Sequence, residues 1–209
     1  HRVSVVMPAY RDCFQRGLAI QDTGHRIEFP IGQRLVAAQL LETSLPDSDV
    51  PVYLVQQPAF FDRPGLYGEG GRDYPDNCER FVFFCRAVME VLPRLDWAPQ
   101  VIHAHDWQTG LVPVYLETVY RDAPAYRDVA TVFTIHNLAY QGVCDPGWLL
   151  GLGPRAHPYA RFGGCNPLAG GLLTGRFSAD RDAPAGSRFH TDSSPSTYTS
   201  TSFPFGSRR

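Results

Sequence analysis

Lysine is absent from the 209 residues, so all 19 basic side chains are arginine and no chemistry of a lysine amine is available. The acidic residues number 21, which gives a formal net charge of −2 at pH 7. This balance provides no basic surface of the kind that binds nucleic acid, and no polybasic or long apolar segment offers a membrane anchor. We therefore expect neither nucleic acid nor a membrane as a partner.

Cysteine is scarce, and no two cysteines form a CxxC pair. An odd number of widely spaced cysteines predicts neither a disulfide framework nor a zinc knuckle. We also expect no signal peptide, because the first residues lack a charged start followed by a long apolar core. Together these absences favour a reducing compartment, the cytoplasm. The cysteines are Cys13, Cys78, Cys85, Cys144 and Cys165.

Short valine-rich runs alternate with a helical pattern. Val3 to Met7 and Val50 to Pro58 are typical of strands buried on both faces of a parallel sheet, and "RIEFP" is typical of an added edge strand. From Asp76 to Leu95 apolar residues recur at helical spacing, and Asp76 with Glu79 has the form of a capping box. The segment from Gly65 to Asp73 has the composition of a loop.

Two further strands are predicted in "QVIHAH" and "VATVFTIH", separated by a helix that starts at Asp106 or Thr109 and ends near Tyr120. The order strand, helix, strand predicts an α/β fold with a Rossmann-like, doubly wound parallel sheet. From Asp145 to Arg209 the chain has no Val, Ile or Glu and becomes rich in Gly, Pro, Ser, Thr and Arg. We expect a domain over 1–144 and a disordered, low-complexity tail over 145–209, with a shifted reading frame as one hypothesis for the tail.

Histidines gather where a fold of this class binds its ligands. His103 and His105 leave the same face of one strand, and His136 with Asn137 closes the next. Ligands of such sheets bind at the carboxyl ends of the strands. Each histidine alone is equally compatible with a structural role, and an HxH motif is also compatible with a zinc hydrolase, which would need further ligands.

Other polar residues nearby have two interpretations each. Trp107 fits either a platform that stacks on a sugar or a wedge between helix and sheet. Asp76 and Asn77 fit either a ligand wall or a helix cap. The patch "NLAYQG", Asn137 to Gly142, offers amide and phenol groups to sugar hydroxyls, although turns are rich in Asn and Gly for backbone reasons alone.

Four segments in order, "HRVSVVMPAYRD", "YPDNCERFVFF", "VIHAHDWQTGLVPVYL" and "TVFTIHNLAYQG", resemble the N-terminal catalytic domain of bacterial glycogen synthase and plant starch synthase. The resemblance covers His1 to about Val143. It implies a partial N-terminal lobe of a GT-B glycosyltransferase, in which two Rossmann-like lobes face a cleft. The implied activity is glucose transfer from ADP-glucose to the non-reducing end of an α-1,4-glucan, glycogen or starch, with retention of configuration.

The resemblance also implies the roles of the residues, with no metal and no cofactor. His105 would be the catalytic residue that binds and positions the donor glucose while the diphosphate leaving group departs. The implied substrate-binding residues are Asp76, Asn77, His103, Asp106, Trp107, Gln108, His136, Asn137, Tyr140 and Gln141.

Two elements of the family pattern are absent from the 209 residues: a first strand with a lysine- and glycine-rich turn, and the C-terminal lobe. A cleft with one wall cannot exclude water, so we expect negligible activity from this chain alone. The alternatives are another GT-B glycosyltransferase, such as a sucrose-synthase-like enzyme, a non-catalytic glucan-binding remnant, and the zinc-dependent hydrolase.

Overall fold

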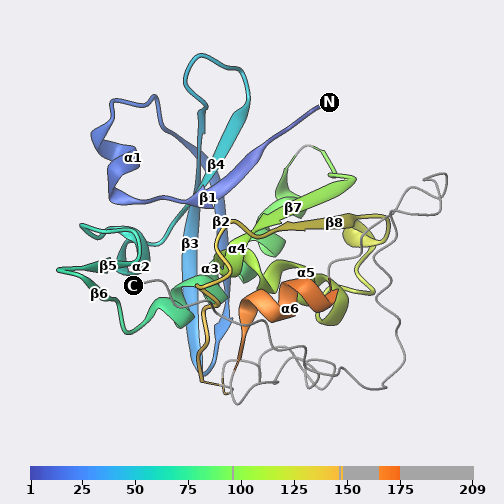
Figure 1. Cartoon of the computed structure of the whole chain (residues 1–209). Coiled ribbons are helices and arrows are strands. Elements are labelled where there is room, and N and C mark those ends of the chain that lie inside the picture. Colours follow the sequence, from blue (N-terminus) through green and yellow to red (C-terminus); the bar gives the residue numbers. More distant parts are fainter. Residues whose placement is uncertain (96, 146, 148–164, 175–209) are drawn as a thin grey trace, which may run out of the picture. The chain divides into compact units, whose positions relative to one another are not determined.

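The strands predicted from the valine-rich runs form two separate sheets in the computed structural model, which describes residues 1–95, 97–145, 147 and 165–174 (Figure 1). All of these residues belong to one unit, His1–Phe177. The first sheet has the strand order β1-β4-β3-β2. β1 (Val5–Pro8) and β4 (Pro51–Gln56) are parallel, as expected for runs that alternate with helices.

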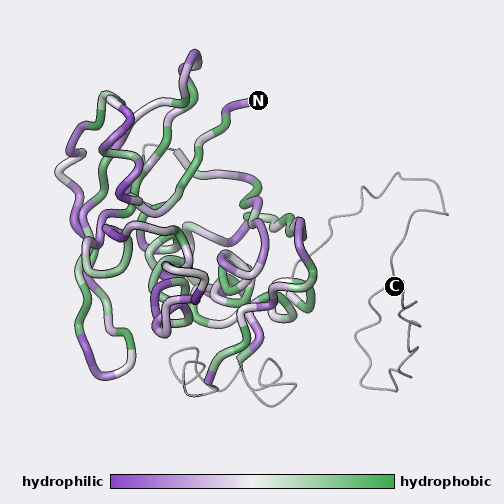
Figure 2. The backbone as a smooth tube through the Cα atoms, turned by 60° about the vertical axis from the view of Figure 1, so that its left-hand side comes forward, coloured by the Kyte–Doolittle hydropathy of each residue, from purple (hydrophilic) through white to green (hydrophobic). Residues whose placement is uncertain are grey.

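The other two strands of this sheet are antiparallel and form a long hairpin, β2 (Gln21–Ile31) and β3 (Arg34–Ser44). The predicted edge strand at "RIEFP" is therefore confirmed as part of a longer β2. β3 was not predicted, because "RLVAAQLLETS" has no clear alternation of apolar and polar residues. Figure 2 shows that the tip of this hairpin is hydrophilic, whereas its strands carry hydrophobic stretches that face the core.

The second sheet contains β7 (Val101–His105) and β8 (Ala130–Thr134), which pair in parallel with His103 opposite Val132 and His105 opposite Thr134. Both strands lie where the sequence predicts them. This parallel register places the residues that follow the two strands at one edge of the sheet.

The longest helix, α3 (Asn77–Val91), continues into a 3-10 turn, η1 (Leu92–Arg94). It buries Phe81, Phe83 and Phe84 in the main core, as its apolar spacing predicts. The predicted capping box is wrong. The Asp76 carboxylate makes no cap bond and is held by Arg63, while Glu79 lies against Arg34. Both carboxylates are bound by arginines that are distant in sequence, so neither carboxylate caps the helix.

The single helix predicted after β7 is divided into α4 (Asp106–Thr109) and α5 (Leu111–Thr118). The junction, Gly110, lies against the backbone of Pro167, where an added Cβ would come within 2.1 Å of the carbonyl oxygen. Pro167 begins α6 (Pro167–Thr174), which packs on α4 and α5. The sequence predicts a disordered tail from Asp145, and this prediction is wrong for the residues of α6, which form a helix. Most of the remaining tail, 148–164 and 175–209, lies outside the described residues.

Short elements complete the described part of the chain. They are α1 (Arg11–Gln15), α2 (Pro58–Phe61), η2 (Pro124–Tyr126) and a short hairpin inside the predicted loop. The strands of this hairpin, β5 (Gly68–Glu69) and β6 (Arg72–Asp73), have two residues each. Within the described residues no helix is both long and apolar enough to cross a membrane.

Candidate active site

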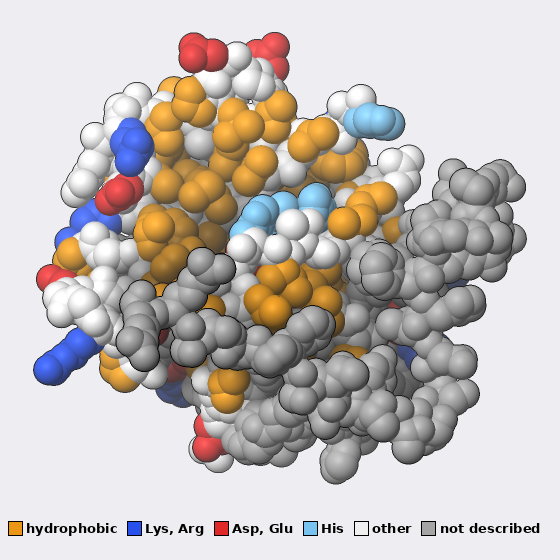
Figure 3. All heavy atoms as spheres, in the orientation of Figure 1, with side chains coloured by type: hydrophobic (Ala, Val, Ile, Leu, Met, Phe, Trp, Pro, Cys, Tyr) orange, Lys and Arg blue, Asp and Glu red, His pale blue; other side chains and the backbone are white. Residues whose placement is uncertain are grey.

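Three histidines converge at the carboxyl ends of β7 and β8. Nδ1 of His105 lies 3.1 Å from Nε2 of His136, and their rings are nearly parallel with centroids 5.4 Å apart. The ring centroid of His103 lies 4.1 Å from that of His105. All three side chains are exposed, and Figure 3 shows histidines gathered in the middle of this face beside hydrophobic side chains. The convergence predicted from strand spacing is therefore present.

Asp106 fastens the ends of the two strands to each other. Its Oδ1 accepts hydrogen bonds from the backbone N–H groups of His136, at 2.7 Å, and Asn137, at 3.2 Å. Asp106 itself has a φ of +54°, in the left-handed region that Asp and Asn tolerate better than most residues. One carboxylate therefore fixes where His136 lies relative to His105.

Two threonines hold the histidines of β7 in place. The Thr109 hydroxyl accepts from the backbone N–H of His105 at 2.5 Å and donates to its carbonyl oxygen at 2.6 Å. The Thr134 hydroxyl lies 2.8 Å from Nε2 of His103. His103 thus has one ring nitrogen occupied by the protein, whereas no hydrogen bond to Nε2 of His105 exists within the described part of the chain.

The surroundings of His105 shift the pKa of its imidazole. Partial burial lowers its pKa below the ordinary value, and the neighbouring charges of His103 and His136 lower it further. The neutral form of His105 is therefore favoured. In a neutral pair one nitrogen of the His105–His136 contact donates and the other accepts, and Nε2 of His105 takes the complementary role toward a ligand. A neutral imidazole of this kind suits hydrogen bonding to a sugar hydroxyl.

Trp107 has a packing role in the structure. It is only 9% exposed and meets Phe81 edge to face, with ring centroids 4.9 Å apart. Gly142 also lies against the indole with a φ of +67°, and a Cβ there would come within 2.1 Å of the ring. Next to it, the Gln108 carbonyl accepts a bond from the Cys85 thiol, and the Gln108 side chain bonds to Tyr67. Of the two interpretations of Trp107, the wedge is the one that the geometry favours.

The loop after β8 is arranged mainly by its own hydrogen bonds. Oδ1 of Asn137 accepts from the backbone N–H of Ala139 at 3.0 Å, which makes an Asx turn. Tyr140 is 62% exposed, so its phenol is available to a ligand. Oε1 of Gln141 accepts from Asn166 at 2.9 Å, so part of its side chain is already engaged.

Asp76 and Asn77 lie in a network around a buried arginine. The Asp76 carboxylate binds Arg63 through both oxygens, at 2.7 and 2.6 Å, and this bond lowers the pKa of Asp76. Arg80 is completely buried and donates to Asn77 as well as to the carbonyls of Phe60 and Leu66. This network orders the wall next to α3, and a direct contact of Asp76 or Asn77 with substrate stays a prediction.

A disulfide links Cys78 at the start of α3 to Cys144 in the loop after β8. The sequence predicts no such bond. The two cysteines are 66 residues apart, and only the fold brings their Cα atoms to 5.9 Å. Three cysteines remain as buried free thiols: Cys13, Cys85 and Cys165.

No three His, Cys, Asp or Glu side chains of the described residues are placed to hold one metal ion. The HxH motif therefore offers no donor set for the zinc hydrolase alternative in this part of the chain.

Two site residues, Thr134 and Tyr67, were missed by the sequence interpretation, and it did not foresee the packing role of Gly142 or the place of Arg80 at the centre of a buried network. Thr134 could have been found, because it precedes His136 at strand spacing and so shares its face. The contacts of Tyr67 and Gly142 with the helix after β7 depend on long-range packing, for which the sequence carries no local pattern.

Parallel strands with polar side chains converging beyond their carboxyl ends define a Rossmann-like α/β domain with a ligand-binding edge. The comparisons with known proteins make this specific. The family model described as "Starch synthase catalytic domain" matches residues 1–177. The chain therefore belongs to the starch synthase catalytic domain family, which confirms the fold class predicted from the motifs: part of the N-terminal lobe of a GT-B glycosyltransferase.

Curated relatives and a solved structure agree with this assignment. The chain is 43% identical over 159 residues to a glycogen synthase of Syntrophotalea carbinolica, covering 75% of this chain and 32% of the relative. It is 47% identical over 143 residues to glycogen synthase 2 of Geobacter sulfurreducens, covering 68% and 29%. The catalytic domain of starch synthase IV from Arabidopsis thaliana, bound to ADP and acarbose, matches with a TM-score of 0.67 at 26% identity, covering 84% of this chain and 36% of that one. The chain thus spans about a third of the length of the relatives it matches.

Proposed function

We propose that this chain is part of a glycogen or starch synthase that transfers glucose from ADP-glucose to the non-reducing end of an α-1,4-glucan with retention of configuration. The observation that supports it is the arrangement of His103, His105 and His136 in a chain of this family. The relatives are named glycogen synthase, and the similar solved structure binds ADP and acarbose.

In this proposal His105 acts by position and not as a base. Its Nε2 makes a hydrogen bond to a hydroxyl of the donor glucose, while Nδ1 is held by His136. As the bond from the anomeric carbon to the diphosphate breaks, the sugar gains positive charge, and a neutral imidazole does not oppose that charge. His136, Asn137, Tyr140 and Gln141 follow β8 in the chain and would line the sugar site.

The chain alone is expected to bind its substrates weakly and to turn over negligibly, because the described elements supply only one wall of a cleft. The test is a titration of the 209-residue protein with ADP-glucose and, separately, with maltoheptaose, followed by NMR of the imidazole signals. Transfer of labelled glucose to maltoheptaose is measured in parallel. UDP-glucose is included to determine the nucleotide preference.

We expect ADP-glucose to shift the signals of His105 and His136, and His105→Ala to abolish the shift of His136. His25→Ala is the matched control, because His25 is also exposed but lies on β2. Unchanged His105 and His136 signals at saturating donor would contradict the proposed site. Binding of maltoheptaose without any response to a sugar nucleotide would instead support a glucan-binding remnant.

A cytoplasmic location is part of the same proposal. In a reducing compartment Cys78 and Cys144 would be two thiols rather than a disulfide. Thiol labelling of the protein in intact cells before lysis measures this state, and a fully oxidised pair would count against the cytoplasm.

A further inference from the structure

The Cys78–Cys144 disulfide joins two sides of the candidate active site. Cys78 lies in the first turn of α3, and Cys144 ends the loop that follows β8, residues 135–144, which we call the β8 loop. Within the described part of the chain no hydrogen bond joins the β8 loop to α3. The disulfide is therefore a covalent link at a place where the fold supplies no polar contact.

The β8 loop is fastened near its ends and exposed between them. At its start Asp106 accepts hydrogen bonds from two backbone N–H groups of the loop. At its end Cys144 exchanges two backbone hydrogen bonds with Cys165, at 2.9 and 2.8 Å. Tyr140 lies between these two places and is exposed. A segment with little burial between its fastenings opens locally at low cost, so a covalent bond at one end changes how well it is ordered.

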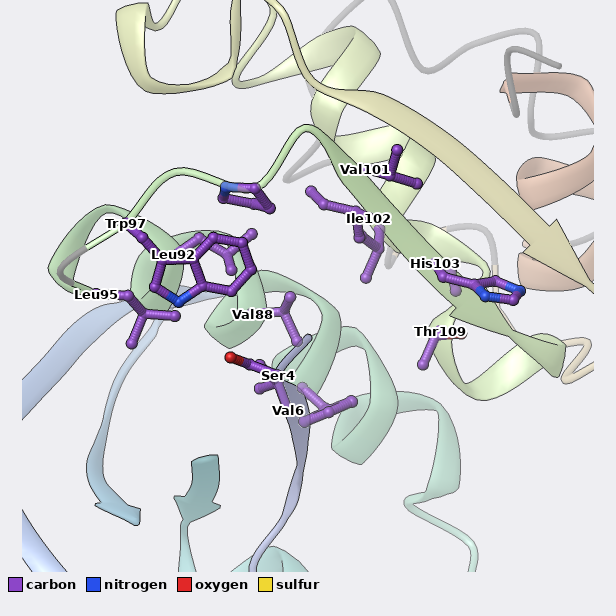
Figure 4. Close-up of a pocket in the computed structure, with 14 residues that line it drawn as sticks. Ser4, Val6, Val88, Leu92, Leu95, Trp97, Val101, Ile102, His103 and Thr109 are labelled. Carbon is purple, nitrogen blue, oxygen red and sulfur yellow. The ribbon is translucent and has the colours of Figure 1, made fainter. Parts of the chain in front are cut away.

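The two bonded cysteines are more accessible than the free ones. Cys78 and Cys144 are half-buried, whereas Cys13, Cys85 and Cys165 are buried. A cavity of about 120 Å³ lies beside β7, and no cysteine is among the residues that line it, so it exposes none of the free thiols (Figure 4). Exposed disulfides exchange with thiols in solution more readily than buried ones. A small dithiol can therefore reach the Cys78–Cys144 bond.

Cys165 is a second candidate partner for Cys144, and its surroundings keep it out of the exchange. Residues that exchange two backbone hydrogen bonds across antiparallel strands have Cα atoms about 5.5 Å apart, which is a separation that a disulfide spans. Burial raises the pKa of Cys165 to about 11, so almost none of this thiol is the reactive thiolate at pH 7. Cys144 therefore pairs with Cys78.

We propose that Cys78 and Cys144 are a reversible oxidation site: the disulfide orders the β8 loop, and its reduction to two thiols releases the loop from α3. In the reduction a thiolate of a small dithiol attacks one sulfur, its second thiol then displaces the mixed disulfide, and the dithiol leaves as a cyclic disulfide. Two electrons and two protons pass to Cys78 and Cys144, and the cyclic disulfide reverses the step.

The β8 loop carries residues of the candidate sugar site, so its order affects binding. A glucan that binds the reduced form must first order the loop and Tyr140, and this cost weakens the binding. This consequence rests on the proposed function, whereas the change in loop order does not.

The experiment equilibrates the 209-residue protein in mixtures of reduced and oxidised dithiothreitol, starting from the dithiol and from the disulfide form, without any sugar. Thiol blocking and mass spectrometry measure the oxidised fraction and identify the bonded pair. Hydrogen exchange at the backbone amides of Cys144 and Cys165 measures loop order, and the His136 amide, held by Asp106, is the internal reference. We expect the same oxidised fraction from both directions and about tenfold faster exchange at the two cysteine amides in the reduced form.

The matched variants are Cys78→Ser and Cys13→Ala. Cys78→Ser cannot form the bond, so its β8 loop is expected to exchange at the fast rate in both buffers. Cys13 is a buried free thiol of α1, so Cys13→Ala is expected to keep the full response to the redox buffer. Maltoheptaose is then titrated into both forms of the wild-type protein, and we expect about tenfold weaker binding to the reduced form.

Three results would overturn the proposal. They are a disulfide that dithiothreitol reduces only after urea unfolding, equal exchange at Cys144 and Cys165 in both forms of the wild-type protein, and a Cys144–Cys165 bond in the oxidised protein. Equal affinity of the two forms for maltoheptaose would overturn the effect on glucan binding. Absence of binding to either form would count against the proposed function alone, because the exchange measurement contains no sugar.

Discussion

Replacing Asp106 with alanine is expected to destabilise the edge of the sheet that carries the candidate active site. The wild-type carboxylate accepts two backbone hydrogen bonds, from His136 and Asn137. Hydrogen bonds to charged groups contribute about 1.5–3 kcal/mol each, and the lower value applies here because Asp106 is partly exposed. Alanine also tolerates the left-handed backbone at this position poorly, which adds about 1 kcal/mol.

We therefore expect Asp106→Ala to lower the free energy of unfolding by about 4 kcal/mol, a large part of the 5–15 kcal/mol typical of a domain. Asp106→Gly removes the same bonds but relieves the backbone, so its loss is about 1 kcal/mol smaller. Asp106→Asn keeps a neutral acceptor and loses about 1 kcal/mol. Urea unfolding measures all three variants, and hydrogen exchange at His136 and Asn137 locates the effect. The reasoning is refuted if alanine and asparagine give equal losses or if exchange at these two amides is unchanged.

Three further predictions concern the disulfide, a glycine and the pH dependence. Cys144→Ser should lower the free energy of unfolding by about 4 kcal/mol under oxidising conditions, from the entropy of a loop closed across 66 residues, and by nothing under a thiol reductant; urea midpoints in both buffers test this. Gly142→Ala should cost about 2–4 kcal/mol, because its Cβ would overlap the Trp107 indole at 2.1 Å, whereas Gly17→Ala, at a similar φ of +68° but in open space, should cost about 1 kcal/mol; equal melting temperatures for the two variants would contradict the packing argument. The folded-state pKa of His105 is lowered, so the unfolded chain binds more protons than the folded protein at mildly acidic pH. The contribution of His105 to stability is therefore complete above the unfolded pKa near 6.5 and is lost as pH falls through the folded value. NMR titration of the imidazole tests this, and a pKa at or above the ordinary value would exclude it.

A large part of the fold could be predicted from local sequence patterns. β1, β4, β7, β8 and α3 all form where alternation or helical spacing predicts them, because burial of one face depends on residues only two to four positions apart. β3 was missed because its pairing with β2 and β4, and not its own pattern, makes it a strand. The capping box failed for the same kind of reason, since Arg63 is distant in sequence from the helix that Asp76 would have capped.

The sequence alone decided that His103 and His105 share a face and that His136 follows the next strand, because side chains alternate along a strand whatever lies around it. Tertiary structure decided the rest of the site. It made Asp106 the clamp between two strand ends and brought Cys78 to Cys144. Each of these depends on which segments become neighbours across tens of residues, and that choice is made by the packing of the whole domain rather than by any short stretch of the chain.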